Sequence, residues 1–446
     1  MTVNYSDHGY GKSGVNFTLK SLDAPAVRGS EDSVRRVMNK MIARSEYEAL
    51  KSTVKAIGVT KNFQEVINTF DVPMDETPAG FRIESYLESD GVLLVDLVRD
   101  ISCDKNGMKR PTKTIFSADS ANPYEVAPIS ALLGNLTCNP GIVYDLFINN
   151  PKANVGGKFK TIEEVMTEIG RVLGPGCDIS VELNNPFEED FEKILDECKK
   201  FEEILTKYRL VVKVPHMGPV NGSNVSELLT GDKKFSKRYD QPTTEDAFRS
   251  HNLALRLREH GYRINYTLMF EPYQTALALQ AKPAFINSFV RHRMSQSEQM
   301  KNLLAFYDIS KDAKHLEDLR TLMLNVDLLS KNEADKDLLK VKLFAEELLK
   351  YRKTTEHEGS DGLDSARHSL RMLKQNNLPD TRLIICSMEG SLNYPDIDKM
   401  ASEPEFADVI DRLVITAEPG YLARFTSASH VVSYQRRFMN AVQGVK

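Results

Sequence analysis

Eight short apolar runs alternate with longer amphipathic segments from about residue 112 onward, and this alternation constrains the fold more than any other feature. Segments between the runs, such as Glu188–Tyr208, carry apolar residues at helical spacing. Eight strands that each precede a helix are what a closed parallel barrel requires. The sequence therefore predicts an α/β fold, a (β/α)₈ TIM barrel. The predicted strands are Thr114–Ala118, Leu133–Thr137, Asp178–Leu183, Leu210–Pro215, Tyr262–Leu268, Ala284–Phe289, Arg382–Cys386 and Arg412–Thr416.

An open, doubly wound sheet is the alternative that the same alternation allows. Such sheets commonly bind nucleotides through a Gly-x-Gly-x-x-Gly turn after a strand, and no predicted strand here is followed by one. Gly11-Lys12-Ser13 is not a phosphate-binding loop, because Ser6 stands where the first glycine belongs and no strand precedes it. The closed barrel is the better interpretation.

The predicted domain organisation is an N-terminal extension over residues 1–105, partly helical, followed by the barrel over 106–446. In the extension, a helix is expected over 46–70, and the run 91–98 fits a strand or a buried helical turn. Two insertions interrupt the barrel. The insertion at about 217–250 is polar and turn-rich, whereas the one at about 295–380 reads as mostly helical.

Charge and composition exclude several classes of partner. The net charge is −5 and the basic residues are scattered, so no nucleic-acid partner is expected. The 5 cysteines lack metal-binding or C-x-x-C spacing and fit reduced thiols in a cytosolic protein. No stretch approaches the ~18 apolar residues of a membrane span, and no signal segment is evident. We expect a cytoplasmic protein without a membrane partner; homo-oligomer formation is left open.

Several polar residues interrupt the predicted strands near their carboxyl ends, where barrel enzymes keep their catalytic groups. Singly, each has an ordinary structural explanation: a helix cap, a structural ion pair or a lysine reaching the surface. Lys213 lies between Val212 and Val214, where burial is expected to lower its pKa. A neutral lysine can attack a carbonyl and form an imine. The interrupting residues are Asp119, Asn139, Glu182, Lys213, Asn265 and Thr267.

The order of these motifs resembles that of the transaldolase family. The resemblance covers about residues 112–425 and excludes the N-terminal hundred residues and both insertions. Each motif is short, but their ordered succession is fairly specific. The segments that carry it are Phe116–Asn122, Gly134–Pro140, Ser180–Leu183, Val212–Pro215, Gly261–Phe270 with Gln274–Ala276, Ile286–Val290 and Val414–Thr416.

The resemblance implies a class I aldol mechanism on a small sugar or sugar phosphate, without cofactor or metal. Lys213 would form a Schiff base with the ketose donor, and Asp119 would move the proton of the hydroxyl at the breaking C–C bond. Glu182 and Thr267 would handle the water of imine formation. Asn139 and Asn265 would hold the hydroxyls of the dihydroxyacetone unit, which is released or transferred to an aldehyde.

The sequence departs from the family where the substrate phosphate is usually held. His292 stands at an arginine position after the sixth strand, and Glu389 replaces an arginine after the seventh, where a carboxylate would repel phosphate. Two further hypotheses therefore remain: a Schiff-base aldolase or lyase on a non-phosphorylated substrate, and a non-catalytic barrel used for binding. The residues expected to contact substrate in this region are Asn287, Ser288, Phe289, Arg291, His292, Arg293 and Ser387.

Overall fold

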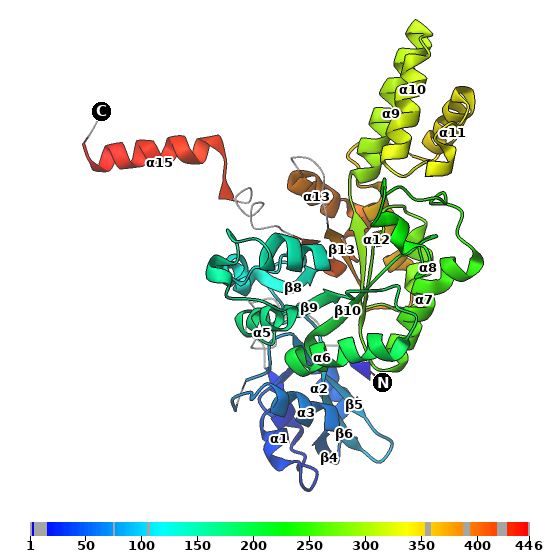
Figure 1. Ribbon diagram of the computed structural model, residues 1–446. Helices are drawn as coiled ribbons and strands as arrows, with labels where there is room; N and C mark the ends of the chain where they lie inside the picture. Colours follow the sequence, from blue (N-terminus) through cyan, green and yellow to red (C-terminus); the bar gives the residue numbers. More distant parts are fainter. Residues whose placement is uncertain are drawn as a thin grey trace.

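A computed structural model describes residues 2–3, 16–74, 76–104, 108–352, 358–386, 393–416 and 426–444. Ser387 and Glu389 lie outside these ranges. Figure 1 shows an N-terminal domain below a barrel, with a group of helices standing above the barrel on the opposite side. None of the described helices combines the length and the apolar character needed to cross a bilayer.

The barrel is closed and all of its strand pairs are parallel, in the order β10-β11-β12-β13-β14-β7-β8-β9. This confirms the predicted (β/α)₈ barrel, and each of the eight predicted runs overlaps one strand. The strands are β7 (Ile115–Asp119), β8 (Leu133–Cys138), β9 (Asp178–Glu182), β10 (Leu210–Pro215), β11 (Ile264–Thr267), β12 (Phe285–Phe289), β13 (Arg382–Cys386) and β14 (Leu413–Thr416).

Helices surround the barrel because each has an apolar face to bury. The helix α5 is an example. Thr161 caps the start of this helix by accepting a hydrogen bond from the Glu164 backbone N–H, and the apolar residues of α5 lie on one buried face. The surrounding helices are α4 (Pro123–Val126), η3 (Gly141–Ile148), α5 (Ile162–Leu173), α6 (Phe191–Arg209), α7 (Thr244–Glu259), α8 (Gln274–Gln280), α12 (Asp364–Gln375) and α13 (Asn393–Ala401).

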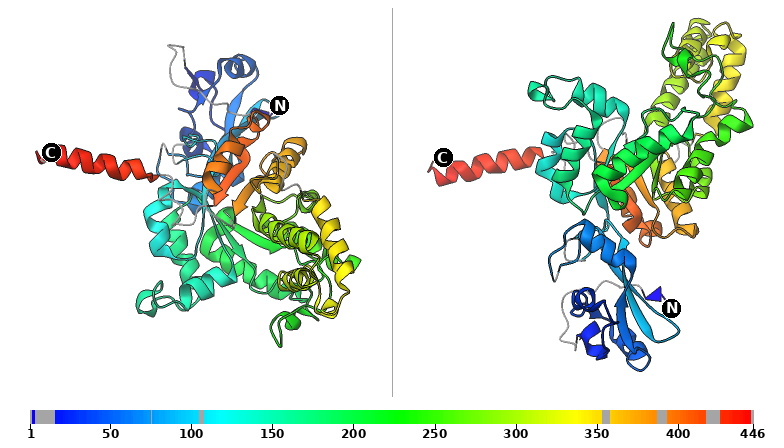
Figure 2. Two further views of the ribbon diagram at one scale, coloured as in Figure 1. Left: turned by 90° about the horizontal axis from the view of Figure 1, so that it is seen from above. Right: turned by 60° about the horizontal axis from the view of Figure 1, so that its bottom comes forward.

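The second insertion is helical, as its sequence pattern indicates. Helices α9 (His292–Ser310), α10 (Lys314–Asn325) and α11 (Leu338–Lys350) pack around a core of their own that includes Met300, Leu319 and Val341. Figure 2 shows this group standing off the barrel, and the helix α15 (Ser429–Val442) projecting to one side. The first insertion is a loop with one short turn, η5 (Val225–Leu228), before α7 begins.

The N-terminal domain is built on a sheet, so the description of this region as partly helical is incomplete. Its four-stranded sheet has the order β1-β5-β6-β4. The predicted helix over 46–70 is wrong, because residues 56–59 pair in parallel with β6 and bury Ile57. The elements are β1 (Thr2–Val3), β2 (Phe17–Thr18), η1 (Leu19–Leu22), α1 (Glu31–Arg35), β3 (Met41–Ile42), α2 (Arg44–Leu50), β4 (Ala56–Val59), α3 (Lys61–Thr69), β5 (Phe81–Leu87) and β6 (Val92–Arg99).

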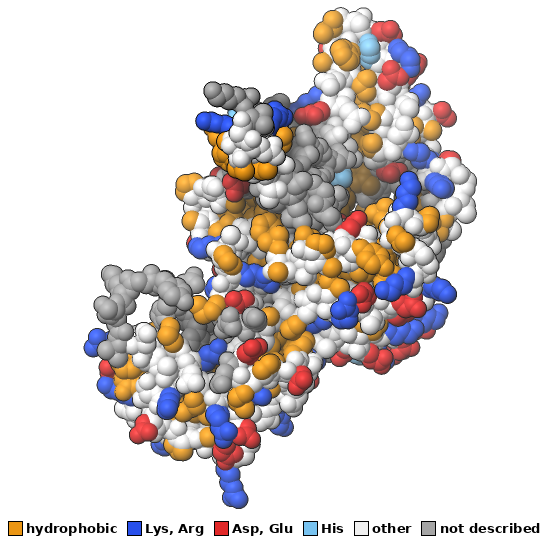
Figure 3. Space-filling view, turned by 90° about the vertical axis from the view of Figure 1, so that its left-hand side faces the viewer, with side chains coloured by type: hydrophobic (Ala, Val, Ile, Leu, Met, Phe, Trp, Pro, Cys, Tyr) orange, Lys and Arg blue, Asp and Glu red, His pale blue; other side chains and the backbone are white. Residues whose placement is uncertain are grey.

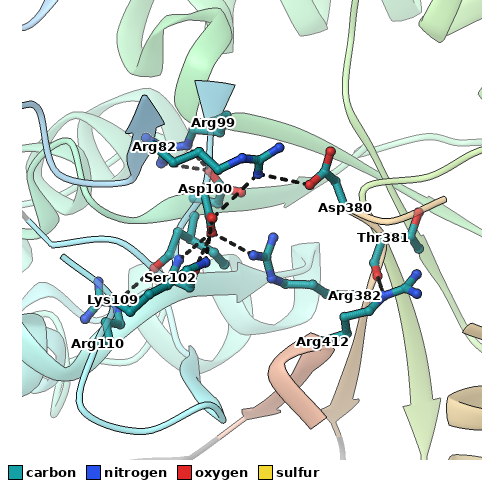
Figure 4. Close-up of polar contacts among 12 residues, drawn as sticks. Arg82, Arg99, Asp100, Ser102, Lys109, Arg110, Asp380, Thr381, Arg382 and Arg412 are labelled. Carbon is teal, nitrogen blue, oxygen red and sulfur yellow. Dashed lines mark hydrogen bonds and ion pairs between the residues drawn. The ribbon is translucent and has the colours of Figure 1, made fainter. Parts of the chain in front are cut away.

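The N-terminal domain closes the lower end of the barrel. Ile101, just after β6, packs inside the barrel with Ile115, Val211 and Phe285. Beside it, Asp100 is 2% exposed and pairs with Arg382 of β13 at 2.8 Å, with Lys109 at 2.9 Å and with Arg82 at 3.5 Å (Figure 4). These contacts fasten the domain to the barrel end opposite the carboxyl ends of the strands.

Replacing Asp100 by Asn is expected to lower the free energy of unfolding by about 3 kcal/mol, because Arg382, whose side chain is 11% exposed, loses its counter-charge. Burial raises the pKa of Asp100, but the charges of Arg382 and Lys109 lower it by a larger amount. The pKa of Asp100 is therefore lower in the folded protein than in the unfolded chain. Its contribution is therefore complete above the unfolded pKa of about 3.9 and is lost as pH falls through the folded pKa. Urea unfolding at neutral and acidic pH measures both effects. The matched control is Asp380→Asn, since Asp380 is 58% exposed and its ion pair among the described residues is with Arg82. A similar loss in both variants would contradict this account.

Charged side chains of both signs are interspersed over the face seen in Figure 3, rather than gathered in a field of one sign.

Candidate active site

The interior of the barrel changes from apolar to polar towards the carboxyl ends of its strands. Alternate residues of a strand face the interior, and the apolar base includes Ile115, Val211, Phe285, Ile384 and Val414. The interior residues two or four positions after these apolar residues are mostly polar. The residues that pair with them in register on the neighbouring strands are mostly polar as well. The polar interior set is Ser117, Asp119, Asn135, Thr137, Ser180, Glu182, Lys213, Asn265, Thr267, Asn287 and Thr416.

Lys213 lies at the centre of this polar interior. Its side chain is 5% exposed, and its Nζ lies 3.2 Å from Glu182 Oε2 on the adjacent strand. The same Nζ donates a hydrogen bond of 3.3 Å to the carbonyl of Cys138. In register, Lys213 lies between Glu182 of β9 and Asn265 of β11. A buried amine is thus held against a carboxylate at the end of the barrel where catalytic groups usually lie.

Asp119 ends β7 and is the second carboxylate near this amine. Its Oδ1 accepts a hydrogen bond of 2.9 Å from Thr137 Oγ1. Burial raises the pKa of Asp119, and this rise is only partly offset by the charge of Lys213 and the hydrogen bond from Thr137. A carboxyl group with a raised pKa can both accept and return a proton near neutral pH.

The pKa of Lys213 is raised, which corrects the prediction that burial lowers it. Burial does act to lower the pKa, but the carboxylates of Glu182 and Asp119 together raise it by more. In the resting site the ammonium form is therefore favoured. The neutral amine needed for attack on a carbonyl has to be produced by transfer of its proton to a neighbouring base, and Glu182 is within reach.

Replacing Glu182 by Gln is expected to lower the pKa of Lys213, because burial then acts against the ammonium with one carboxylate fewer. Labelling of Lys213 by formaldehyde and cyanoborohydride, followed by peptide mass measurement at a series of pH values, would show half-maximal labelling at lower pH. The control is Glu188→Gln, which removes a partly exposed carboxylate paired with Lys193. If the pH of half-maximal labelling were unchanged or higher in the Glu182 variant, Glu182 would not stabilise the ammonium form of Lys213.

Two interior amides carry polar atoms with no hydrogen-bond partner in the described part of the chain. Both side-chain atoms of Asn265, which is fully buried beside Lys213, lack a partner, as does Oδ1 of Asn287. Thr416 Oγ1 is also buried without a hydrogen-bond partner among the described residues. An unsatisfied buried polar atom is costly. These groups are therefore suited to bind hydroxyl groups, which can both donate and accept.

Other residues expected to contact substrate have different positions. Thr267 ends β11 and is 1% exposed. Asn139 follows β8, and its Oδ1 accepts from the Ile142 N–H at 2.9 Å, at the start of η3. Ser288 faces outward and shares a hydrogen bond of 3.0 Å with Ser365 of α12. Of these, only Thr267 lies in the polar interior set with Lys213.

The residues after β12 form an aromatic group and two ion pairs. Phe289 faces the interior, and its ring centroid lies 4.6 Å from that of Phe270, which His292 meets edge-on at 5.6 Å. Arg291 pairs with Asp396 of α13. Arg293 pairs with Glu271 at 3.1 Å and with Asp364 of α12. The structure does not bring either arginine into contact with Lys213, Glu182 or Asp119.

Sequence reasoning missed a polar chain along the neighbouring strands. Asn135 donates to Ser117 Oγ at 2.9 Å and accepts from Ser180 Oγ at 3.2 Å. Each of these residues lies two positions before a strand-end polar residue on its own strand. The two-residue period of a strand was the signal that could have found them. Cys386, buried at the end of β13, was also missed; burial and then the Asp119 charge raise the pKa of its thiol, and the charge of Lys213 partly offsets this rise.

Comparison with known proteins adds little to this geometry. No protein-family model and no curated protein matches the sequence. Among solved structures, the chain shows similarity to an aldose reductase from Giardia lamblia, with 16% sequence identity and a TM-score of 0.22. The match covers 41% of this chain and 59% of the other, so the chain spans less than two thirds of that protein. The barrel assignment therefore rests on strand order and pairing.

Proposed function

We propose that this protein is a transaldolase-like aldolase that forms a Schiff base between Lys213 and a ketose donor. It would release a three-carbon dihydroxyacetone unit or transfer it to an aldehyde acceptor. The observation that carries the proposal is the buried Lys213 amine 3.2 Å from the Glu182 carboxylate, with the charge of Asp119 acting on the same amine. Lysines are almost never fully buried unless they are paired, and here the partner is a carboxylate at the barrel end where catalytic groups usually lie.

Imine formation begins with proton transfer from the Lys213 ammonium to Glu182. The neutral amine adds to the donor carbonyl carbon, the C–N bond forms as the C=O π bond breaks, and the proton that the attacking nitrogen then loses passes to the former carbonyl oxygen. Glu182 then returns its proton to the leaving hydroxyl, and water departs as the iminium forms. Thr267, buried at the end of the adjacent β11, is the hydroxyl that we assign to hold this water.

Carbon–carbon cleavage then uses Asp119 as the base. The carboxylate accepts the proton of the donor hydroxyl next to the breaking bond, the aldehyde forms, and the bonding electron pair moves to the iminium to give an enamine. Addition of the enamine to another aldehyde reverses these steps. We assign the Asn265 amide, whose two polar atoms have no partner among the described residues, and Oδ1 of Asn287 to bind the hydroxyls of the three-carbon unit.

The direct test of this activity is product formation from labelled donor. Dihydroxyacetone labelled with ¹³C is incubated with the full-length protein and a panel of aldehydes, with and without phosphate, and the products are followed by NMR. We expect a labelled ketose with at least one aldehyde of the panel. If no aldehyde gives a labelled ketose and fructose is not cleaved to dihydroxyacetone, the protein is not an aldolase of this type.

A further inference from the structure

The segment that follows β12, at the same end of the barrel as Lys213 and Glu182, carries arginines that already have carboxylate partners. Arg291 and Arg293 follow β12 directly and are 9% and 8% exposed. Arg291 is held by Asp396 and donates from Nε to the carbonyl of Asp361 at 2.9 Å. Arg293 lies between Glu271 and Asp364. Both guanidinium groups are thus directed into the surrounding loops and helices.

The pairing continues into a wider network. Arg352, 6% exposed, pairs with Glu271 at 2.9 Å. Arg367 of α12 pairs with Asp361 at 2.9 Å and with Glu403 at 2.6 Å. A phosphate dianion entering this region would have to displace a partly buried carboxylate or lie beside it. Either is unfavourable, since like charges repel and a displaced carboxylate loses its ion pair.

The surface that does face the interior at this point is aromatic. Phe289 lies on the same face of β12 as Asn287, and the Phe270 ring packs against it, tilted by 35°. His292 completes the group through contacts with both rings. Aromatic rings pack well against the C–H groups of an uncharged substrate and give a dianion no hydrogen-bond donors on their faces.

We propose that the acceptor subsite is specific for uncharged aldehydes and discriminates against phosphorylated ones. This inference rests on the proposed function, because it concerns the aldehyde that leaves or joins the enamine at Lys213. The determinants are the carboxylates that neutralise Arg291 and Arg293, together with the ring faces of Phe289 and Phe270.

The first experiment compares two acceptors that differ only in phosphate. With dihydroxyacetone as donor, we expect kcat/KM for glyceraldehyde to exceed that for glyceraldehyde 3-phosphate by about ten-fold or more, the effect of one unfavourable charge contact. Inorganic phosphate should not compete with glyceraldehyde. A preference for the phosphorylated aldehyde, or competitive inhibition by phosphate at low millimolar concentration, would overturn the inference.

The second experiment releases an arginine from its partner. Asp396→Asn removes the carboxylate on Arg291 and is expected to shift the ratio of the two kcat/KM values by about ten-fold towards the phosphorylated aldehyde. The matched control is Asp398→Asn on the same helix, where the carboxylate is exposed and should leave the ratio unchanged. An unchanged ratio in the Asp396 variant would show that carboxylate pairing does not set the preference.

Failure of this inference is distinguishable from failure of the proposed function. Reductive trapping of dihydroxyacetone on Lys213 requires neither an acceptor nor a phosphate. If trapping succeeds while phosphorylated acceptors are preferred, the acceptor inference is wrong and the Schiff-base chemistry stands. If trapping fails, the proposed function itself is wrong.

Discussion

Replacing Lys213 by methionine is expected to abolish ketose formation and cleavage, with a fall in kcat/KM of at least ~10⁴-fold, because the nucleophile of the covalent step is removed. Methionine is nearly as long as the lysine stem and suits a position between buried valines, so the barrel should remain folded. Circular dichroism and urea unfolding would establish that it does. Labelled product formation then measures the activity that remains.

The matched control for this substitution is Lys199→Met on α6. Lys199 is 52% exposed and forms a surface ion pair of 3.1 Å with Asp196, three residues earlier on the same helix. We expect this variant to keep full activity, since exposed ion pairs of this kind contribute about 0–1 kcal/mol and Lys199 lies outside the site. A Lys213 variant that retained a tenth or more of the wild-type activity would rule out Lys213 as the nucleophile.

Asp119→Asn is expected to slow C–C bond cleavage by about 10³-fold while leaving imine formation intact, because the amide cannot accept the hydroxyl proton. The amide oxygen can still accept the hydrogen bond from Thr137, so the local geometry should persist. The two steps are measured on one preparation: fructose cleavage reports the bond-breaking step, and reductive trapping reports the imine. A variant that cleaved fructose at the wild-type rate would remove Asp119 from the mechanism, and one that lost trapping would give it a different role.

The role of Asp119 also predicts how the cleavage rate depends on pH. Burial raises the pKa of Asp119, and only the ionised carboxylate can take the hydroxyl proton. The cleavage rate of the wild-type protein should therefore rise with pH as Asp119 ionises, at a pH above the usual range of an aspartate. The Asn variant should lack this rise. Asp196→Asn, which alters an exposed carboxylate on α6, serves as the control and should keep the wild-type profile.

The barrel could be predicted from the sequence because each strand is a short local pattern and the pairing of successive parallel strands follows from their order. The N-terminal sheet could not be predicted in this way. The strand β4 is four residues long, lies between two short helices, and is stabilised by pairing with β6, which is more than thirty residues away in the sequence. Tertiary pairing of this kind overrides the local helical pattern.

The site was partly predictable for a related reason. Lys213, Glu182 and Asp119 were identified because strand ends converge in a barrel. Asn287 and Ser288 were both predicted to contact substrate, but adjacent residues of a strand face opposite sides, and Ser288 faces α12. The partners of Arg291 and Arg293 could not be predicted, since Asp396 and Asp364 lie 105 and 71 residues further along the chain. The pKa of Lys213 was predicted in the wrong direction because burial was foreseen without the combined charge of the two acids.

The central claim is that Lys213 is the residue that binds the donor covalently. The most direct test is to treat the full-length protein with dihydroxyacetone and borohydride, then locate any mass increase by peptide mapping. The account predicts one reduced dihydroxyacetone adduct, on Lys213, and no adduct in the Lys213→Met variant. An unmodified Lys213, or an adduct that appears equally on exposed lysines such as Lys199, would contradict it.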